Sequence, residues 1–79
     1  MRCKVLSLHG VEFEGDTKSL GAKSVSGEIT VLDHHHPIMT VLVRGTVTAE
    51  GTSGIRKEIE IESGFLEMDD QNNLTVLIN

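Results

Sequence analysis

The sequence has few of the residues that small proteins use as covalent or aromatic anchors. Its 79 residues contain one cysteine, Cys3, one proline, Pro37, two phenylalanines, and no tryptophan or tyrosine. A single cysteine excludes an internal disulfide. A chain of this length buries only about 60% of the surface that it exposes when unfolded. We therefore expect one domain over residues 1–79, with a core of Val, Ile, Leu and Met and no deep catalytic cleft.

Basic residues and long apolar runs are scarce as well. The chain contains seven Lys and Arg residues and 12 Asp and Glu residues, which gives a net charge of −5. Nucleic-acid affinity depends on cations that neutralise phosphates and on aromatic stacking, so we expect no nucleic-acid partner. The apolar runs are far shorter than the roughly 20 residues that span a bilayer, so we expect no membrane insertion. Neither common glycine-rich phosphate motif is present, and we expect no nucleotide and no cofactor.

The hydrophobic period is two rather than 3.6 along most of the chain, which is typical of β-strands. In "IRKEIEIES", residues 55–63, apolar and charged side chains alternate. "EITVLD" (28–33) and "IMTVLV" (38–43) are more continuously apolar, which predicts strands that are covered on both faces or that lie centrally in a small sandwich. "EGTSGI" (50–55) and "DDQNN" (69–73) carry turn residues and predict hairpin tips. Gly45 ends an apolar strand, and Gly45→Val is expected to damage folding if this position needs positive φ. The pattern predicts an all-β fold, a flattened antiparallel β-sandwich or barrel of two short sheets.

Three consecutive histidines, His34, His35 and His36, separate two of these strands. Imidazole is a common zinc or copper ligand, which makes a metal-binding β-domain an alternative function. A zinc site needs three or four protein ligands, however, and neither Cys3 nor His9 lies at a recognisable spacing. A cupin-like enzyme is a weaker alternative for the same reason. The simpler interpretation is a polar turn that Pro37 stiffens.

The order of short motifs along the chain resembles a known family. The matching text is "FEG" at Phe13 to Gly15, "GEITVLDHHHP" at Gly27 to Pro37, "IMTVLVRG" at 38–45, "SGFLEM" at 63–68 and "NNLTVLIN" at 72–79. In this order these segments resemble the N-terminal β-sandwich of the epsilon subunit of F-type ATP synthases, which is called delta in mitochondria.

The resemblance implies a non-catalytic subunit of the central stalk. Such a subunit links the gamma subunit to the c-ring of a proton- or sodium-translocating ATP synthase. It is a peripheral protein on the cytoplasmic side of the bacterial inner membrane. Glu28 matches the family glutamate near the c-ring loops, and His35 matches the family histidine of the same loop. The resemblance thus makes the whole loop a candidate contact with the c-ring or gamma: Glu28, Asp33, His34, His35, His36.

Apolar side chains on one outer sheet face are expected to hold gamma. The candidates come from the apolar segment after the histidines: Ile38, Met39, Val41, Leu42. The chain departs from the family pattern at Asp33, where the family has proline, and at Ser63, where it has glycine. Most family members continue into two regulatory C-terminal helices, which residues 1–79 do not include. We therefore expect no C-terminal helical domain and no response to ATP.

Overall fold

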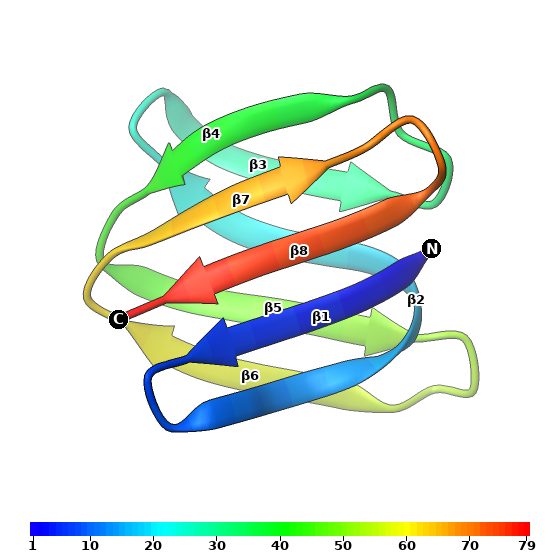
Figure 1. Ribbon diagram of the computed structural model, residues 1–79, viewed down its shortest axis with the longest axis horizontal. Coiled ribbons are helices and arrows are strands. Elements are labelled where there is room, and N and C mark those ends of the chain that lie inside the picture. The colour runs from blue at the N-terminus through cyan, green and yellow to red at the C-terminus, as the bar shows by residue number, and fades with distance from the viewer.

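The computed structural model describes residues 1–79, and its regular structure consists of β-strands alone (Figure 1). The eight strands are β1 Arg2–Ser7, β2 Gly10–Ser24, β3 Gly27–Leu32, β4 Ile38–Leu42, β5 Gly45–Gly51, β6 Arg56–Ile61, β7 Gly64–Met68 and β8 Asn73–Ile78. No helix is long and apolar enough to cross a bilayer. The all-β prediction from the period-two pattern is confirmed.

The strands form two facing layers that share β2. The front layer contains β4, β7, β8, β1 and the first part of β2, and the back layer contains β3, the rest of β2, β5 and β6 (Figure 1). The pairing of β2 with β5 is irregular between Thr17 and Ser19, and such a bulge bends a strand and increases its twist. The two layers of the expected sandwich are therefore joined through β2 into one continuous eight-stranded sheet.

One strand pair is parallel, which the sequence pattern did not predict. β1 runs parallel to β8, with Arg2 beside Asn73 and Leu6 beside Leu77. All other pairs are antiparallel. The alternation of apolar and polar residues specifies which face of a strand is buried and not the direction of its neighbour, so the first and last strands could not be oriented from sequence.

The core lies between the layers and is aliphatic. Fourteen buried hydrophobic residues form one cluster, which includes Val5, Leu20, Leu66 and Val76. The strand at 38–42 is covered on one face only, because Leu42 is 1% exposed while Met39 and Val41 are 65% and 48% exposed. The expectation that "IMTVLV" is covered on both faces was wrong.

The connections gather at two ends of the molecule (Figure 1). The histidine end carries the N-terminus and the loops 33–37, 52–55 and 69–72, and the opposite, C-terminal end carries the turns 8–9, 25–26, 43–44 and 62–63. The predicted hairpin tips at 50–55 and 69–73 are confirmed, with positive φ at Gly54 and Asn72.

Candidate functional site

Asp33 anchors the histidine loop, residues 33–37, to the start of the chain. The Met1 ammonium donates a hydrogen bond to Asp33 Oδ1, and another to the carbonyl oxygen of Thr17 at 2.8 Å. The Asn72 side-chain amide donates to the same Asp33 oxygen at 2.9 Å. Both hydrogen bonds lower the pKa of the Asp33 carboxyl, and the one from the ammonium has the larger effect. Asp33 thus fastens the loop to two neighbouring segments.

Asn72 also fixes the backbone of the histidine loop. The His34 N–H donates to Asn72 Oδ1 at 2.8 Å. His34 and Asn72 are the non-glycine residues with positive φ, at 62° and 63°, a conformation that costs most side chains free energy. The paired loops hold both residues in it. Asn72 was expected only as part of a hairpin tip, so sequence reasoning missed it as the partner of His34.

The imidazoles do not gather into a ligand set. His35 Nδ1 lies 2.7 Å from the carbonyl oxygen of His36, and the two rings meet edge to face with centroids 6.4 Å apart. No three His, Cys, Asp or Glu side chains are placed to hold a metal ion together. Cys3 is buried in the core and His9 lies in the turn at the C-terminal end, so neither supplies the missing ligand.

The histidine loop and the β7–β8 turn enclose a shallow polar hollow of about 450 Å³. It is lined by residues 34–37 and 69–72. Within the turn, backbone N–H groups of Asn73 and Gln71 donate to Asp69 Oδ1 and lower the pKa of the Asp69 carboxyl. The hollow is therefore a preorganised polar surface that can offer imidazole and carboxylate groups to a partner.

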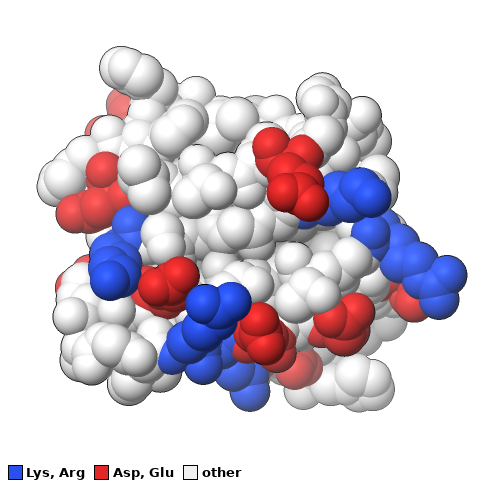
Figure 2. Space-filling model, turned by 180° about the vertical axis from the view of Figure 1, so that it is seen from behind, with Lys and Arg blue, Asp and Glu red and all other residues white.

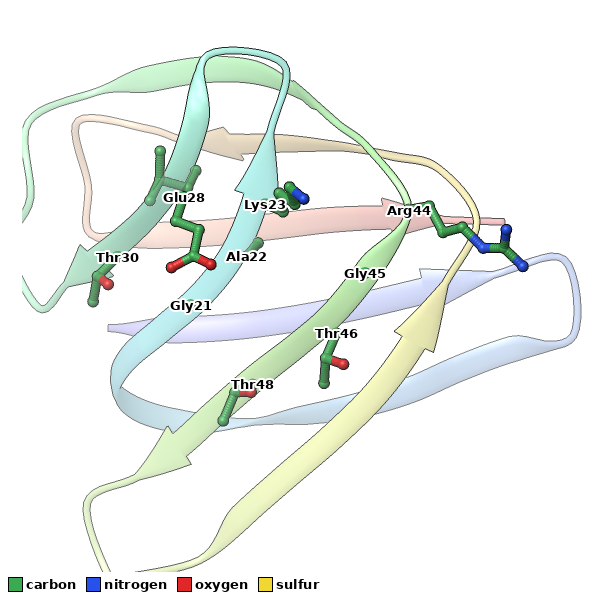
Figure 3. A pocket seen from close by; sticks show the side chains of 10 residues that line it. Gly21, Ala22, Lys23, Glu28, Thr30, Arg44, Gly45, Thr46 and Thr48 are labelled. Atoms are coloured by element: carbon green, nitrogen blue, oxygen red, sulfur yellow. The ribbon is translucent and has the colours of Figure 1, made fainter.

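Glu28 lies on a second hollow, on the outer face of the back layer (Figure 3). This groove of about 640 Å³ lies over β3, β2 and β5 and is floored partly by glycine. Lys23 is the cross-strand neighbour of Glu28, but the two side chains point apart, Glu28 toward Gly21 and Lys23 toward Gly45 (Figure 3). Neither makes an ion pair, so both charges are free to meet a partner.

Glu28 and the histidines do not belong to one loop. Glu28 is the second residue of β3, and the histidines follow after that strand ends at Leu32. Five residues of extended chain separate Glu28 from Asp33 by about 16 Å. The expected single loop is therefore wrong, because Glu28 lies near the start of β3 and the histidines follow the end of that strand.

The four apolar candidates on β4 divide between its two faces. Leu42 is in the core, and Ile38 is half-buried and packed against it, so Leu42 is not available to a partner as we had expected. Met39 and Val41 do face outward. The strand partners Phe65 and Leu77 extend this outer surface from Val41. Sequence reasoning missed both, although Leu77 stands opposite the buried Leu74 and Val76 in the alternation of "NLTVLIN".

The outer face of the back layer is charged. Arg56 pairs with Glu58 at 3.2 Å and with Glu50 at 3.8 Å, and the Thr46 hydroxyl donates to Glu60. Figure 2 shows basic and acidic side chains alternating across this side of the molecule. A charged surface of this kind is suited to solvent or to a polar partner rather than to an apolar one.

The sequence and the fold together match one protein family, described as "ATP synthase, Delta/Epsilon chain, beta-sandwich domain", over residues 1–79. The chain belongs to this family. This delta/epsilon-type domain is 38% identical over 64 residues to the ATP synthase epsilon chain of Exiguobacterium sp. and 36% identical over 69 residues to that of Endomicrobium trichonymphae. The matches cover 81% and 87% of this chain and 47% and 49% of the relatives. The chain thus spans about half the length of the curated relatives it matches.

Solved structures share the fold of this delta/epsilon-type domain. A chain of the Euglena gracilis mitochondrial ATP synthase aligns with a TM-score of 0.87 at 17% identity, over 96% of this chain and 48% of that one. A chain of the Tetrahymena thermophila central stalk and c-ring aligns with a TM-score of 0.83 at 11% identity, over 99% and 62%. At these identities the likeness shows the β-sandwich fold.

Proposed function

We propose that this domain is a non-catalytic part of the central stalk of an F-type ATP synthase, where it connects the gamma subunit to the c-ring. The match of all 79 residues to the delta/epsilon sandwich family carries the proposal. Its bacterial relatives in Exiguobacterium sp. and Endomicrobium trichonymphae, which are named ATP synthase epsilon chains, support a peripheral position on the cytoplasmic side of a bacterial inner membrane. The role needs no reactive group, only a stiff body with contacts on its surface.

The architecture suits mechanical linkage. One sheet, continuous through β2, closes around a core of aliphatic side chains. Closely packed interiors are hard to compress and transmit strain. Force applied at one end is therefore carried through backbone hydrogen bonds and packed side chains to the other end, which is what a coupling between two rotor components requires.

The charged groove is the proposed contact with the c-ring. Glu28 stands free beside Lys23 and several threonine hydroxyls (Figure 3), which together can bind a polar loop. Since His34, His35 and His36 lie at the opposite end of β3, we assign them to a second rotor contact. Asp33 acts there by holding the loop and not by touching the partner.

The apolar outer face of the front layer is the proposed contact with gamma. Met39 and Val41 are exposed on it. Apolar, fully desolvated centres dominate the affinity of many protein interfaces. The front layer offers such a centre, whereas the outer face of the back layer carries charged and polar side chains.

Binding measurements on purified components test the proposal. The domain is expected to bind gamma and to bring gamma into a complex with isolated c-rings, measured by co-purification and by calorimetry. A domain that folds normally but binds neither component would exclude the rotor role.

Substitution of Glu28 tests the groove contact. Glu28→Lys is expected to leave the fold intact and to weaken c-ring attachment by about fivefold, since exposed ion pairs contribute up to about 1 kcal/mol. The effect should shrink as salt is raised. Glu58→Lys, which makes the same change of charge on β6, serves as the control. Unfolding of the Glu28→Lys variant, or an equal loss of affinity for the c-ring in both variants, would contradict the assignment.

A further inference from the structure

The α-ammonium group of Met1 is enclosed where β2 passes from the front layer to the back layer. The Thr17 N–H donates to the Met1 carbonyl oxygen at 2.8 Å, and the ammonium donates to the Thr17 carbonyl oxygen at 2.8 Å. Met1 therefore continues the β1–β2 ladder by one residue, next to the irregularity between Thr17 and Ser19. Met1 is 3% exposed and belongs to the core cluster, so the amine is part of the folded body.

The ammonium faces more acceptors than a backbone amide can use. Besides the Thr17 carbonyl oxygen, Asp33 Oδ1 accepts a hydrogen bond from it, and Asp16 Oδ1 lies 3.5 Å away. An ammonium has three N–H donors and a positive charge, and hydrogen bonds between charged groups are the strong ones. An amide at this nitrogen, formed with an acyl group or with a preceding residue, has one N–H and no charge. It could keep the bond to Thr17 but not the bond to Asp33.

Three hydrogen bonds lead from the ammonium to the backbone of the histidine loop. The first joins the ammonium to Asp33 Oδ1, and the second joins that oxygen to the Asn72 side-chain amide at 2.9 Å. The third joins Asn72 Oδ1 to the His34 N–H at 2.8 Å. His34 and Asn72 both have positive φ, a conformation that persists only where neighbouring contacts hold it. Loss of the ammonium would remove the charged partner of Asp33, the residue that joins the loop to the β7–β8 turn.

We propose that the free α-amino group of Met1 positions the histidine loop, so that an acyl group on this amine releases the loop while the sandwich stays folded. Met1 is thus assigned as a modification site, with a formyl or acetyl group as the modifying chemistry. The inference concerns the state of the domain itself and goes beyond the proposed rotor function. If the histidines form the second rotor contact, the state of the amine sets the strength of that contact.

The other contacts at the start of the chain do not depend on the charge of the amine. The two ladder bonds to Thr17 need one N–H and one carbonyl group, which an acylated Met1 still has. The Arg2 N–H donates to the Asn72 carbonyl oxygen at 3.0 Å, and β1 is paired with β8 from Arg2 to Leu6. Acylation is therefore expected to act on Asp33 and the loop, and to leave β1 in the sheet.

NMR spectroscopy of two forms of the 79-residue chain tests the inference. Chemical synthesis gives one form with a free Met1 amine and one with a formyl group on it. Hydrogen exchange of the His34 amide is expected to be at least about tenfold faster in the formylated form, since the hydrogen bonds that fix its acceptor are weakened. Amides of β7 and β8 are expected to keep their rates. Equal His34 rates in the two forms would overturn the proposal.

The carboxyl groups of two aspartates give a second readout. The pKa of Asp33 is expected to rise toward the ordinary value of about 3.9 after formylation, because the ammonium is the main group that lowers it. The pKa of Asp69 is lowered by backbone N–H groups of its own turn and serves as the internal control. NMR titration of the carboxyl carbons measures both. An unchanged Asp33 pKa, or equal rises in both, would contradict the proposal.

Matched variants separate the lost ion pair from the bulk of the formyl group. In Asp33→Asn, formylation is expected to have little further effect on the His34 amide. In Asp16→Asn it is expected to keep its full effect, since Asp16 lies 3.5 Å from the ammonium and is not part of the histidine loop. An effect of the same size in wild type and both variants would show that the formyl group acts by its volume, and it would end the proposal.

Two further outcomes have a defined meaning. A formylated chain that does not fold would end the proposal, because the free amine would then be required by the whole sandwich and not by the loop alone. None of these measurements involves gamma or the c-ring, so a negative result leaves the rotor function standing. Failure of the domain to bind gamma and the c-ring would in turn leave the role of the amine standing.

Discussion

Gly64 occupies a position in β7 with no room for a side chain. It pairs with Leu42 on one side and with Ile78 on the other. A Cβ atom at Gly64 would lie 2.7 Å from the carbonyl oxygen of Leu77, which is closer than such atoms approach. The obstacle is backbone, so it cannot move aside as a flexible side chain does.

Gly64→Ala is therefore expected to destabilise the domain. The forced backbone shift should lower the free energy of unfolding by about 1–3 kcal/mol, measured by chemical denaturation. Gly21→Ala is the control, because its nearest non-neighbouring atom would be 4.0 Å away and its expected effect is within about 1 kcal/mol. Equal stability of both variants would show that β7 and β8 can separate at this point without cost.

Gly45 shows where reasoning from residue type fails. A glycine at a strand end suggested positive φ, but the glycines with positive φ are Gly10, Gly27 and Gly54. A Cβ at Gly45 would make an ordinary contact with Lys23 Cβ at 3.6 Å. Gly45 does not have the positive φ on which the expected damage by Gly45→Val depended, because backbone conformation at a strand end depends on the path of the next strand.

The Asp33 carboxylate makes the stability of the domain depend on pH. Its pKa is lowered by the Met1 ammonium and by Asn72, so its contribution is complete above the unfolded-state pKa of about 3.9. The contribution is lost as the pH falls through the lowered folded-state pKa.

Asp33→Asn is expected to lose less stability than the wild type as the pH falls through this range. Denaturation curves from pH 7 to pH 2 measure the difference. Asp69→Asn should behave in the same direction, since backbone N–H groups lower the pKa of Asp69. Parallel pH profiles for wild type and Asp33→Asn would show that the loop anchor does not persist in solution.

At the scale of the element, β4 presents two unlike faces in five residues. Its burial alternates from the half-buried Ile38 through the exposed Met39 and Val41 to the buried Leu42. The sequence "IMTVL" is apolar at all but one position and does not reveal which residues are covered. Only the pairing of β4 with β7, which places Leu42 over the core, decides it.

Alanine substitutions along β4 test this alternation. Leu42→Ala is expected to lower the free energy of unfolding by about 2–5 kcal/mol, because it opens a cavity in the core. Met39→Ala is expected to change it by no more than about 0.5 kcal/mol. Thermal unfolding measures both, and comparable losses would place Met39 in the core.

β3 shows how a motif can be recognised while its geometry is missed. The segment from Gly27 to Pro37 resembles the family text as a continuous unit, but residues 27–32 form a strand. An extended strand carries its two ends about 16 Å apart, so Glu28 and the histidines serve different surfaces. The sequence nominated Glu28 and the histidines as candidates, but their separation along β3 could not be predicted from it.

For the whole molecule, strand order determines which parts open first. β8 is paired with β1 and β7, while β3 is paired only with β2 and β6 only with β5. Amide hydrogens of a strand that is hydrogen-bonded to one neighbour exchange with solvent through local opening. Amide hydrogens of a strand between two neighbours exchange only through larger unfolding.

Hydrogen exchange by NMR should therefore rank the strands. Amides of β6 and β3 are expected to exchange faster than those of β8 and β1 under native conditions. If the amides of β6 exchange as slowly as those of β8, the outer edge of the back layer is covered, either by another molecule or by closure of the sheet.

The sequence by itself determined that this protein is an aliphatic all-β domain with polar turns at 50–55 and 69–73. It could do so because the period of apolar residues and the conformational preferences of turn residues are local properties. The tertiary structure decided that β1 and β8 are parallel, that β2 joins the layers, that Glu28 and the histidines are apart, and that Leu42 is buried while Met39 and Val41 face outward. Each of these depends on contacts between residues distant in the chain, which no local pattern encodes.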